Sequence, residues 1–77
     1  MMKDLLIYIA QNLVDHPEQV TVTEKEENGE ITLELRVAEG DMGKVIGRGG
    51  RIAKEIRSLM RSVASRKGVR VSVDIVD

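Results

Sequence analysis

Residues 47–51 read GRGGR, three glycines and two arginines in a row of five. Each glycine costs a helix interior about 0.5–1 kcal/mol relative to alanine, so this run is predicted to interrupt a helix. Backbone without side chains can approach a sugar-phosphate chain closely, and arginine forms charge-assisted hydrogen bonds with phosphate oxygens. These residue types at this spacing therefore indicate the binding of a polyanion.

Spacing excludes two nucleotide-binding loops that also use glycine. A Walker A loop needs a terminal Gly-Lys-Ser/Thr, which occurs nowhere in the chain. A dinucleotide-binding loop needs Gly-x-Gly-x-x-Gly directly after a strand, whereas Gly47-Arg48-Gly49-Gly50 has another interval and follows a predicted helical turn. No paired carboxylates, activated nucleophile or metal ligands converge on the loop, so we expect neither an enzyme nor a bound cofactor or metal.

The remaining pattern is Gly-x-x-Gly between two helices, and taken alone it is more typical of a plain helix-turn-helix connection with a glycine stop. Charge adds a second observation, because the net charge of −1 hides two opposite segments. Residues 43–70 contain nine basic residues and one acidic residue, whereas residues 1–42 contain three basic and ten acidic residues. An anionic partner such as a nucleic acid would explain this asymmetry. Two charged faces that keep the protein soluble or pair with each other would explain it about equally well.

Periodicity predicts the elements that position the loop. Residues 4–15 show helical spacing, with Asp4 as cap, and residues 20–25 and 30–37 suit two strands joined by a turn at Asn28-Gly29. Asp41 can cap a short helix, MGKVI, before the glycines. A longer helix then starts at Arg51 and stops at Gly68, before a strand at residues 69–75. One face of this helix carries Ile52, Ile56, Leu59, Met60 and Val63.

The predicted order is helix-strand-strand-helix-helix-strand, an α+β fold. A strand that returns after a helical excursion is normally parallel to the one it left. We therefore expect a three-stranded mixed sheet, with the first pair antiparallel and the last pair parallel, and three helices packed on one face. With 77 residues the chain has room for one domain, and it has no cysteine to staple it.

In this order of elements, VIGRGG resembles the KH domain of type II topology, whose Gly-x-x-Gly loop clamps four unpaired nucleotides. Over nearly its whole length the chain is most similar to the small bacterial stand-alone KH proteins of the KhpA type. The resemblance implies a single KH domain over residues 1–77 that binds single-stranded RNA in post-transcriptional regulation or RNA chaperoning. It also implies a homodimer, and a heterodimer with a larger KhpB (Jag)-type protein. Many KH domains have isoleucine three residues after the second glycine, where this chain has Ala53.

The expected RNA site combines glycine backbone, cations and apolar contacts. We expect Gly47 and Gly50, which lack a Cβ atom, to admit phosphate, Arg48 and Arg51 to bind it, and Lys44 and Lys54 to add a looser field. The strip under the bases would contain Ile46 and Ala53. The full set is Lys44, Ile46, Gly47, Arg48, Gly49, Gly50, Arg51, Ala53 and Lys54.

Several further features of the sequence bear on how RNA could be bound and on where the protein acts. For Arg57 and Arg61 a solvated helix face is at least as good an interpretation as contact. Tyr8 is the only aromatic residue, so no stacking platform is expected. No segment approaches the roughly 20 apolar residues that span a membrane, and we expect a cytoplasmic protein. The alternative function is that of an adaptor, in which the KH fold serves dimerisation or docking on a larger KH protein and RNA contact is incidental.

Overall fold

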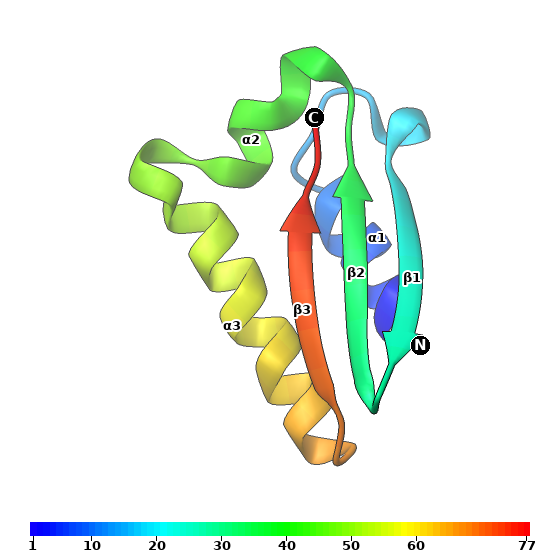
Figure 1. Ribbon diagram of the computed structural model, residues 1–77. Coiled ribbons are helices and arrows are strands. Elements are labelled where there is room, and N and C mark those ends of the chain that lie inside the picture. The colour runs from blue at the N-terminus through cyan, green and yellow to red at the C-terminus, as the bar shows by residue number, and fades with distance from the viewer.

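The computed structural model describes all 77 residues as three helices and a three-stranded sheet, with short 3-10 turns between them (Figure 1). The helices are α1 (Met2–Gln11), α2 (Met42–Ile46) and α3 (Arg51–Arg66). The strands are β1 (Thr21–Glu27), β2 (Glu30–Arg36) and β3 (Arg70–Ile75). The predicted order of elements and the α+β class are confirmed.

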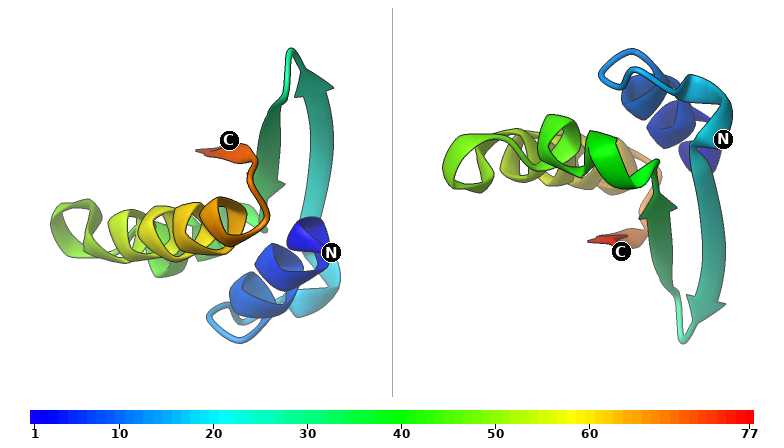
Figure 2. Two further views of the ribbon diagram at one scale, coloured as in Figure 1. Left: turned by 90° about the horizontal axis from the view of Figure 1, so that it is seen from below. Right: turned by 90° about the horizontal axis from the view of Figure 1, so that it is seen from above.

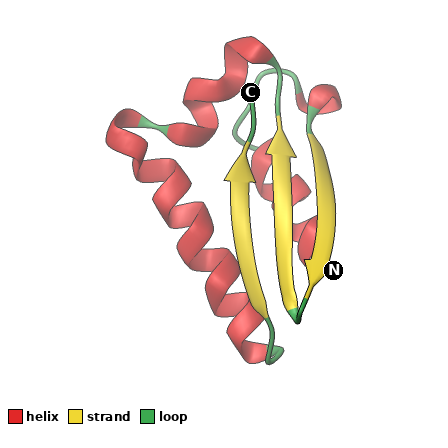
Figure 3. Ribbon diagram, in the orientation of Figure 1, coloured by secondary structure: helices red, strands yellow, loops and turns green.

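The sheet has the predicted mixed topology, with strand order β1-β2-β3. β1 pairs antiparallel with β2, placing Val22 opposite Leu35, and β2 pairs parallel with β3, placing Leu33 opposite Val73. The turn between β1 and β2 has positive φ at Asn28 (55°) and Gly29 (80°), the conformation that an Asn-Gly hairpin favours. β3 is therefore an edge strand, and its outer side faces α3 (Figure 3).

All three helices lie on one side of the sheet, as both views of Figure 2 show. Because side chains alternate along a strand, one sheet face is apolar and meets the helices while the other carries mostly polar residues. The core combines α1, α3 and the inner sheet face, with one valine from α2 and one from the segment before β1. Its residues are Met2, Leu6, Ala10, Val20, Val22, Leu33, Leu35, Val45, Ile56, Met60, Ala64, Val71 and Val73. The outer face includes Thr23, Lys25, Thr32, Glu34, Ser72 and Asp74.

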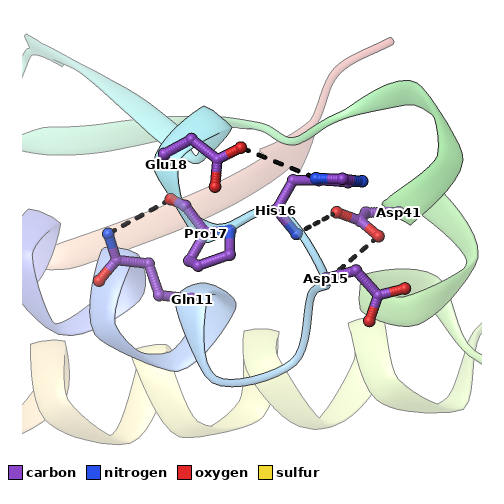
Figure 4. A network of polar contacts seen from close by, with 6 residues as sticks. All are labelled: Gln11, Asp15, His16, Pro17, Glu18 and Asp41. Carbon is purple, nitrogen blue, oxygen red and sulfur yellow. Dashed lines mark hydrogen bonds and ion pairs between the residues drawn. The ribbon is translucent and has the colours of Figure 1, made fainter.

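Two predicted caps are wrong. The first helix starts at Met2 and ends at Gln11, so Asp4 lies within its first turn and caps nothing. Asp41 occupies the N-cap position of α2 but makes no capping hydrogen bond. Its carboxylate is instead buried and accepts the backbone N–H groups of Asp15 (3.2 Å) and His16 (2.9 Å), as Figure 4 shows. Asp41 thus ties the segment after α1 to the start of α2.

The buried face of α3 is centred differently from the prediction, with Ile52 and Val63 only partly buried. Its fully or nearly buried residues follow helical spacing at Ala53, Ile56, Met60 and Ala64. Leu59 was expected in this face, but its side chain is 47% exposed. Leu59 precedes Met60 by one residue, a rotation of about 100° around the helix, which turns it away from the sheet.

Candidate nucleic-acid interface

The Gly47–Gly50 loop joins α2 to α3 at one end of the molecule (Figure 1). Three of its residues have positive φ: Gly47 (77°), Gly49 (65°) and Gly50 (78°). A 3-10 turn at Arg48–Gly50 closes the loop, with the Gly50 N–H donating to the Gly47 carbonyl at 3.0 Å. Residues with a Cβ atom rarely adopt these angles, so the glycines determine the shape of the loop.

The glycines have two different roles. A Cβ atom on Gly47 would lie 2.7 Å from Ile52 Cγ1 and 2.9 Å from the Ile52 backbone nitrogen. The missing side chain of Gly47 therefore lets the end of α2 pack on the first turn of α3, and this protein contact occupies the space that we had expected to admit phosphate. A Cβ atom on Gly49 or Gly50 would meet nothing within 4 Å. Backbone open to a ligand is thus found at Gly49 and Gly50.

Three cations around this open backbone have no partner in the protein. The side chains of Arg48, Arg51 and Lys54 are exposed and make neither an ion pair nor a hydrogen bond. Lys44 differs, because its Nζ lies 3.6 Å from the Asp15 carboxylate. The loop therefore presents an uncompensated positive field at Arg48, Arg51 and Lys54, and a partly compensated one at Lys44.

The apolar part of the expected site is smaller than the sequence indicated. Ile46, at the end of α2, is 36% exposed beside the loop. Ala53 is only 4% exposed, because it lies on the buried face of α3, so it offers almost no surface to a ligand. Its small side chain belongs to the packing beneath the site.

Arg57 makes a contact that the sequence left open. Its Nε donates a hydrogen bond to the Val73 carbonyl of β3 at 3.0 Å, and its side chain is partly buried. The residue lies on the same face of α3 as Lys54, one turn earlier. Its spacing from the loop was a usable signal, but the acceptor lies 16 residues away along the chain and could not be read from the sequence. Arg61, Arg66, Lys67 and Arg70 are exposed.

The depressions in the surface are not lined by the glycine loop. No group of three or more histidine, cysteine or acidic residues is placed to hold a metal ion. The three surface depressions have volumes of about 360–500 Å³. No helix is both long enough and apolar enough to cross a membrane.

Sequence comparison identifies full-length relatives of this chain. A family model described as KhpA/KhpB, KH domain, matches residues 3–75. The RNA-binding protein KhpA of Chlamydia muridarum is 51% identical over 76 residues, which cover 99% of this chain and 97% of that protein. The RNA-binding protein KhpA of Listeria monocytogenes is 42% identical over 76 residues, covering 99% of this chain and 100% of that protein.

Structural comparison finds the same fold inside a larger protein. An Aquifex aeolicus Era variant bound to GDP and AlF4− matches with a TM-score of 0.68 and 21% identity, over 96% of this chain and 29% of that one. Era in complex with MgGDPNP and nucleotides 1506–1542 of 16S ribosomal RNA matches with a TM-score of 0.66 and 20% identity, over 96% of this chain and 28% of that one. At these identities the likeness concerns the fold alone. Together with the family match over residues 3–75, the fold and the Gly-x-x-Gly loop show that the chain belongs to the KhpA/KhpB family of KH-domain proteins.

Proposed function

We propose that this protein binds single-stranded RNA through the Gly47–Gly50 loop and the adjoining faces of α2 and α3. The observation that carries the proposal is the set of three unpaired cations, Arg48, Arg51 and Lys54, around backbone that is open at Gly49 and Gly50. Relatives that are 42–51% identical over almost their full length are named RNA-binding proteins. A small-molecule site would need an enclosed pocket at the loop, and none is found there.

In the proposed complex the phosphates lie against the loop and the bases lie toward the sheet. Gly49 and Gly50 allow close approach of the RNA backbone, and Arg48 and Arg51 donate charge-assisted hydrogen bonds to phosphate oxygens. The first turn of α3 adds the favourable end of its helix dipole. Ile46 supplies an apolar contact, and Lys54 and Lys44 add longer-range electrostatic attraction. Gly47 lets the loop pack against α3, and the buried Ala53 packs beneath the binding surface.

We further propose that binding takes place in the cytoplasm and uses a dimer. The only aromatic residue, Tyr8, belongs to α1 rather than to the loop, so a single domain lacks the stacking that is worth about 1–3 kcal/mol per base elsewhere. Two linked sites raise the effective affinity without new contacts, provided that one RNA spans both. A second copy of this chain or a KhpB-type protein would provide the other site. The role we propose is post-transcriptional regulation or RNA chaperoning.

Replacing Arg48 and Gly49 together with aspartate tests the site. The variant removes one loop cation and adds two anions, so its affinity for a short fluorescent single-stranded RNA should fall at least about tenfold, as measured by anisotropy. Gly49 has open space around it, and aspartate tolerates a left-handed conformation better than most residues, so the fold should survive. Circular dichroism and the melting temperature check this.

Arg66→Asp combined with Lys67→Ser is the matched control. It changes the net charge by the same amount but lies at the far end of α3. If the loop is the site, this variant should lose much less affinity than the loop variant. Equal losses would mean that RNA responds to overall charge alone. A loop variant that is folded and binds RNA normally would overturn the proposal and favour the adaptor function.

A further inference from the structure

The guanidinium of Arg57 is fixed at the edge of the sheet rather than free on the surface. Gly50, Lys54 and Arg57 follow spacings of four and three residues, which places them on one face of α3. Arg57 lies about 10 Å along the helix axis from Gly50. That distance is within reach of a strand whose four nucleotides are clamped at the loop. In the proposed RNA complex, Arg57 would therefore lie beside the path of the bases, one turn beyond Lys54.

The acceptor that holds Arg57 belongs to the outer edge of β3, where no further strand pairs. The Val76 N–H donates to the Leu35 carbonyl at 2.9 Å, so even-numbered residues at this end of the chain bond toward β2. Odd-numbered residues point outward, and the Val73 carbonyl accordingly meets Arg57 Nε at 3.0 Å. This hydrogen bond fixes the plane of the guanidinium against the sheet edge and reduces the side-chain entropy that binding a ligand would otherwise cost.

The two terminal nitrogens of Arg57 remain available. They make no hydrogen bond and no ion pair within the protein. No buried side-chain nitrogen or oxygen lacks a partner, so these unpartnered nitrogens are open to solvent. A guanidinium anchored through Nε presents its terminal N–H groups as a pair of parallel donors. The side chain is therefore arranged to meet two neighbouring acceptors.

We propose that Arg57 is a specificity-determining residue, which selects a base with two adjacent hydrogen-bond acceptors on one edge. Guanine offers such a pair at O6 and N7, and cytosine offers one at N3 and O2. On the corresponding edges adenine and uracil alternate donors with acceptors, so one arginine donor would face a donor. This inference rests on the proposed RNA function, and it predicts a preference for guanine or cytosine at one position of the bound strand.

A purely structural role for Arg57 makes a different prediction. Capping the outward-facing Val73 carbonyl would satisfy the backbone of the edge strand, and removing the cap would affect stability without affecting base preference. Arg57→Lys separates the two roles. Lysine keeps the positive charge and can still donate to Val73, but it lacks the paired donors. Arg61→Lys is the control, because Arg61 lies one turn further along α3, is exposed and makes no hydrogen bond.

The test uses strands of about eight uridines, which exceed the four-nucleotide clamp, with one central uridine replaced by guanine, cytosine or adenine. The unchanged protein should bind the guanine or the cytosine strand about tenfold or more tightly than the adenine and uridine strands. Comparing the guanine and cytosine strands shows which acceptor pair is used. Arg57→Lys should remove this preference while keeping affinity for the all-uridine strand, and Arg61→Lys should retain it.

Two results would overturn the inference. One is equal binding of all four strands by the unchanged protein, and the other is an undiminished preference in a folded Arg57→Lys variant. Either result leaves the proposed RNA function standing as long as the Arg48 and Gly49 double variant still loses binding. If the loop variants are folded and still bind RNA normally, the proposed function itself is contradicted.

Discussion

At the scale of single residues, the glycines of one short loop have unequal tasks. Gly47 combines φ of 77° with ψ of 169°, a region of backbone space that is essentially restricted to glycine. It also lies against Ile52, where no Cβ atom fits. Gly50 is left-handed, with φ of 78° and ψ of 15°, but has open space around it. Gly47 is therefore a folding requirement, whereas Gly50 lies where a ligand can approach.

This difference predicts opposite consequences for two alanine substitutions. Gly47→Ala should lower the free energy of unfolding by at least about 2 kcal/mol, because backbone strain of about 1–3 kcal/mol adds to the overlap with Ile52. Gly50→Ala should cost only about 1–2 kcal/mol of strain and weaken RNA binding in protein that remains folded. Urea titration measures the first effect and RNA anisotropy the second. Equal destabilisation by both substitutions would contradict the distinction.

At the scale of elements, one buried carboxylate links two segments that are distant in sequence. Asp41 is 1% exposed and accepts two backbone N–H groups from the segment that follows α1. In the same region Gln11 donates to the Pro17 carbonyl at 3.5 Å, and His16 approaches Glu18 at 3.7 Å (Figure 4). Asp41 is the residue directly before α2, so this link also fixes where the helix leading to the glycine loop begins.

Asp41→Ala is expected to lower the free energy of unfolding by about 2–3 kcal/mol. The substitution leaves two amides without their charged acceptor, and hydrogen bonds to charged groups are worth about 1.5–3 kcal/mol. Asp15→Ala is the control, because the Asp15 side chain makes only a surface ion pair with Lys44, worth less than about 1 kcal/mol. Chemical denaturation of both variants gives the comparison. A change of under about 1 kcal/mol for Asp41→Ala would mean that water replaces the carboxylate.

At the scale of the whole molecule, the acidic residues of one hairpin are well separated from the glycine loop. The β1–β2 hairpin, with Glu24, Glu26, Glu27 and Glu30, lies at the far end from the glycine loop (Figure 1). The principal extents of the molecule are 34, 23 and 18 Å, several times the Debye length of about 8 Å in physiological salt along the longest axis. The acidic end is therefore screened from the loop, and a net charge of −1 does not oppose binding of a polyanion there.

The proposed dimer makes a prediction at this scale. Sedimentation equilibrium at the concentrations used for RNA binding should give about twice the chain mass of 8.6 kDa. RNA long enough to span two sites should bind much more tightly than a strand that fits one site, because the second contact becomes intramolecular. A mass of one chain, together with affinity that does not depend on RNA length, would contradict a homodimer and leave a KhpB-type protein as the second site.

The sequence by itself determined the features that depend on local pattern. Alternation at residues 30–37 and 69–75, the Asn28-Gly29 turn and the glycine run predicted the strands, the hairpin and the break between two helices, because the period of the side chains follows from the backbone geometry. Composition also located the basic segment, most of whose cations lie in the glycine loop and in α3. Helix ends were less accurate, since Asp4 and Asp41 are good caps in general and neither one caps its helix here.

The tertiary structure decided every feature that depends on a partner distant in sequence. The chain does not show that Asp41 meets the amide of His16, 25 residues earlier, or that Arg57 meets Val73, 16 residues later. It also does not show that Ala53 is buried while Leu59 is exposed. The apolar residues of α3 cover a broad stripe of the helix, and only packing against the sheet determines which residues lie at the centre of that stripe. Local backbone preference acts over a few residues, whereas these contacts arise when α2, α3 and β3 pack together.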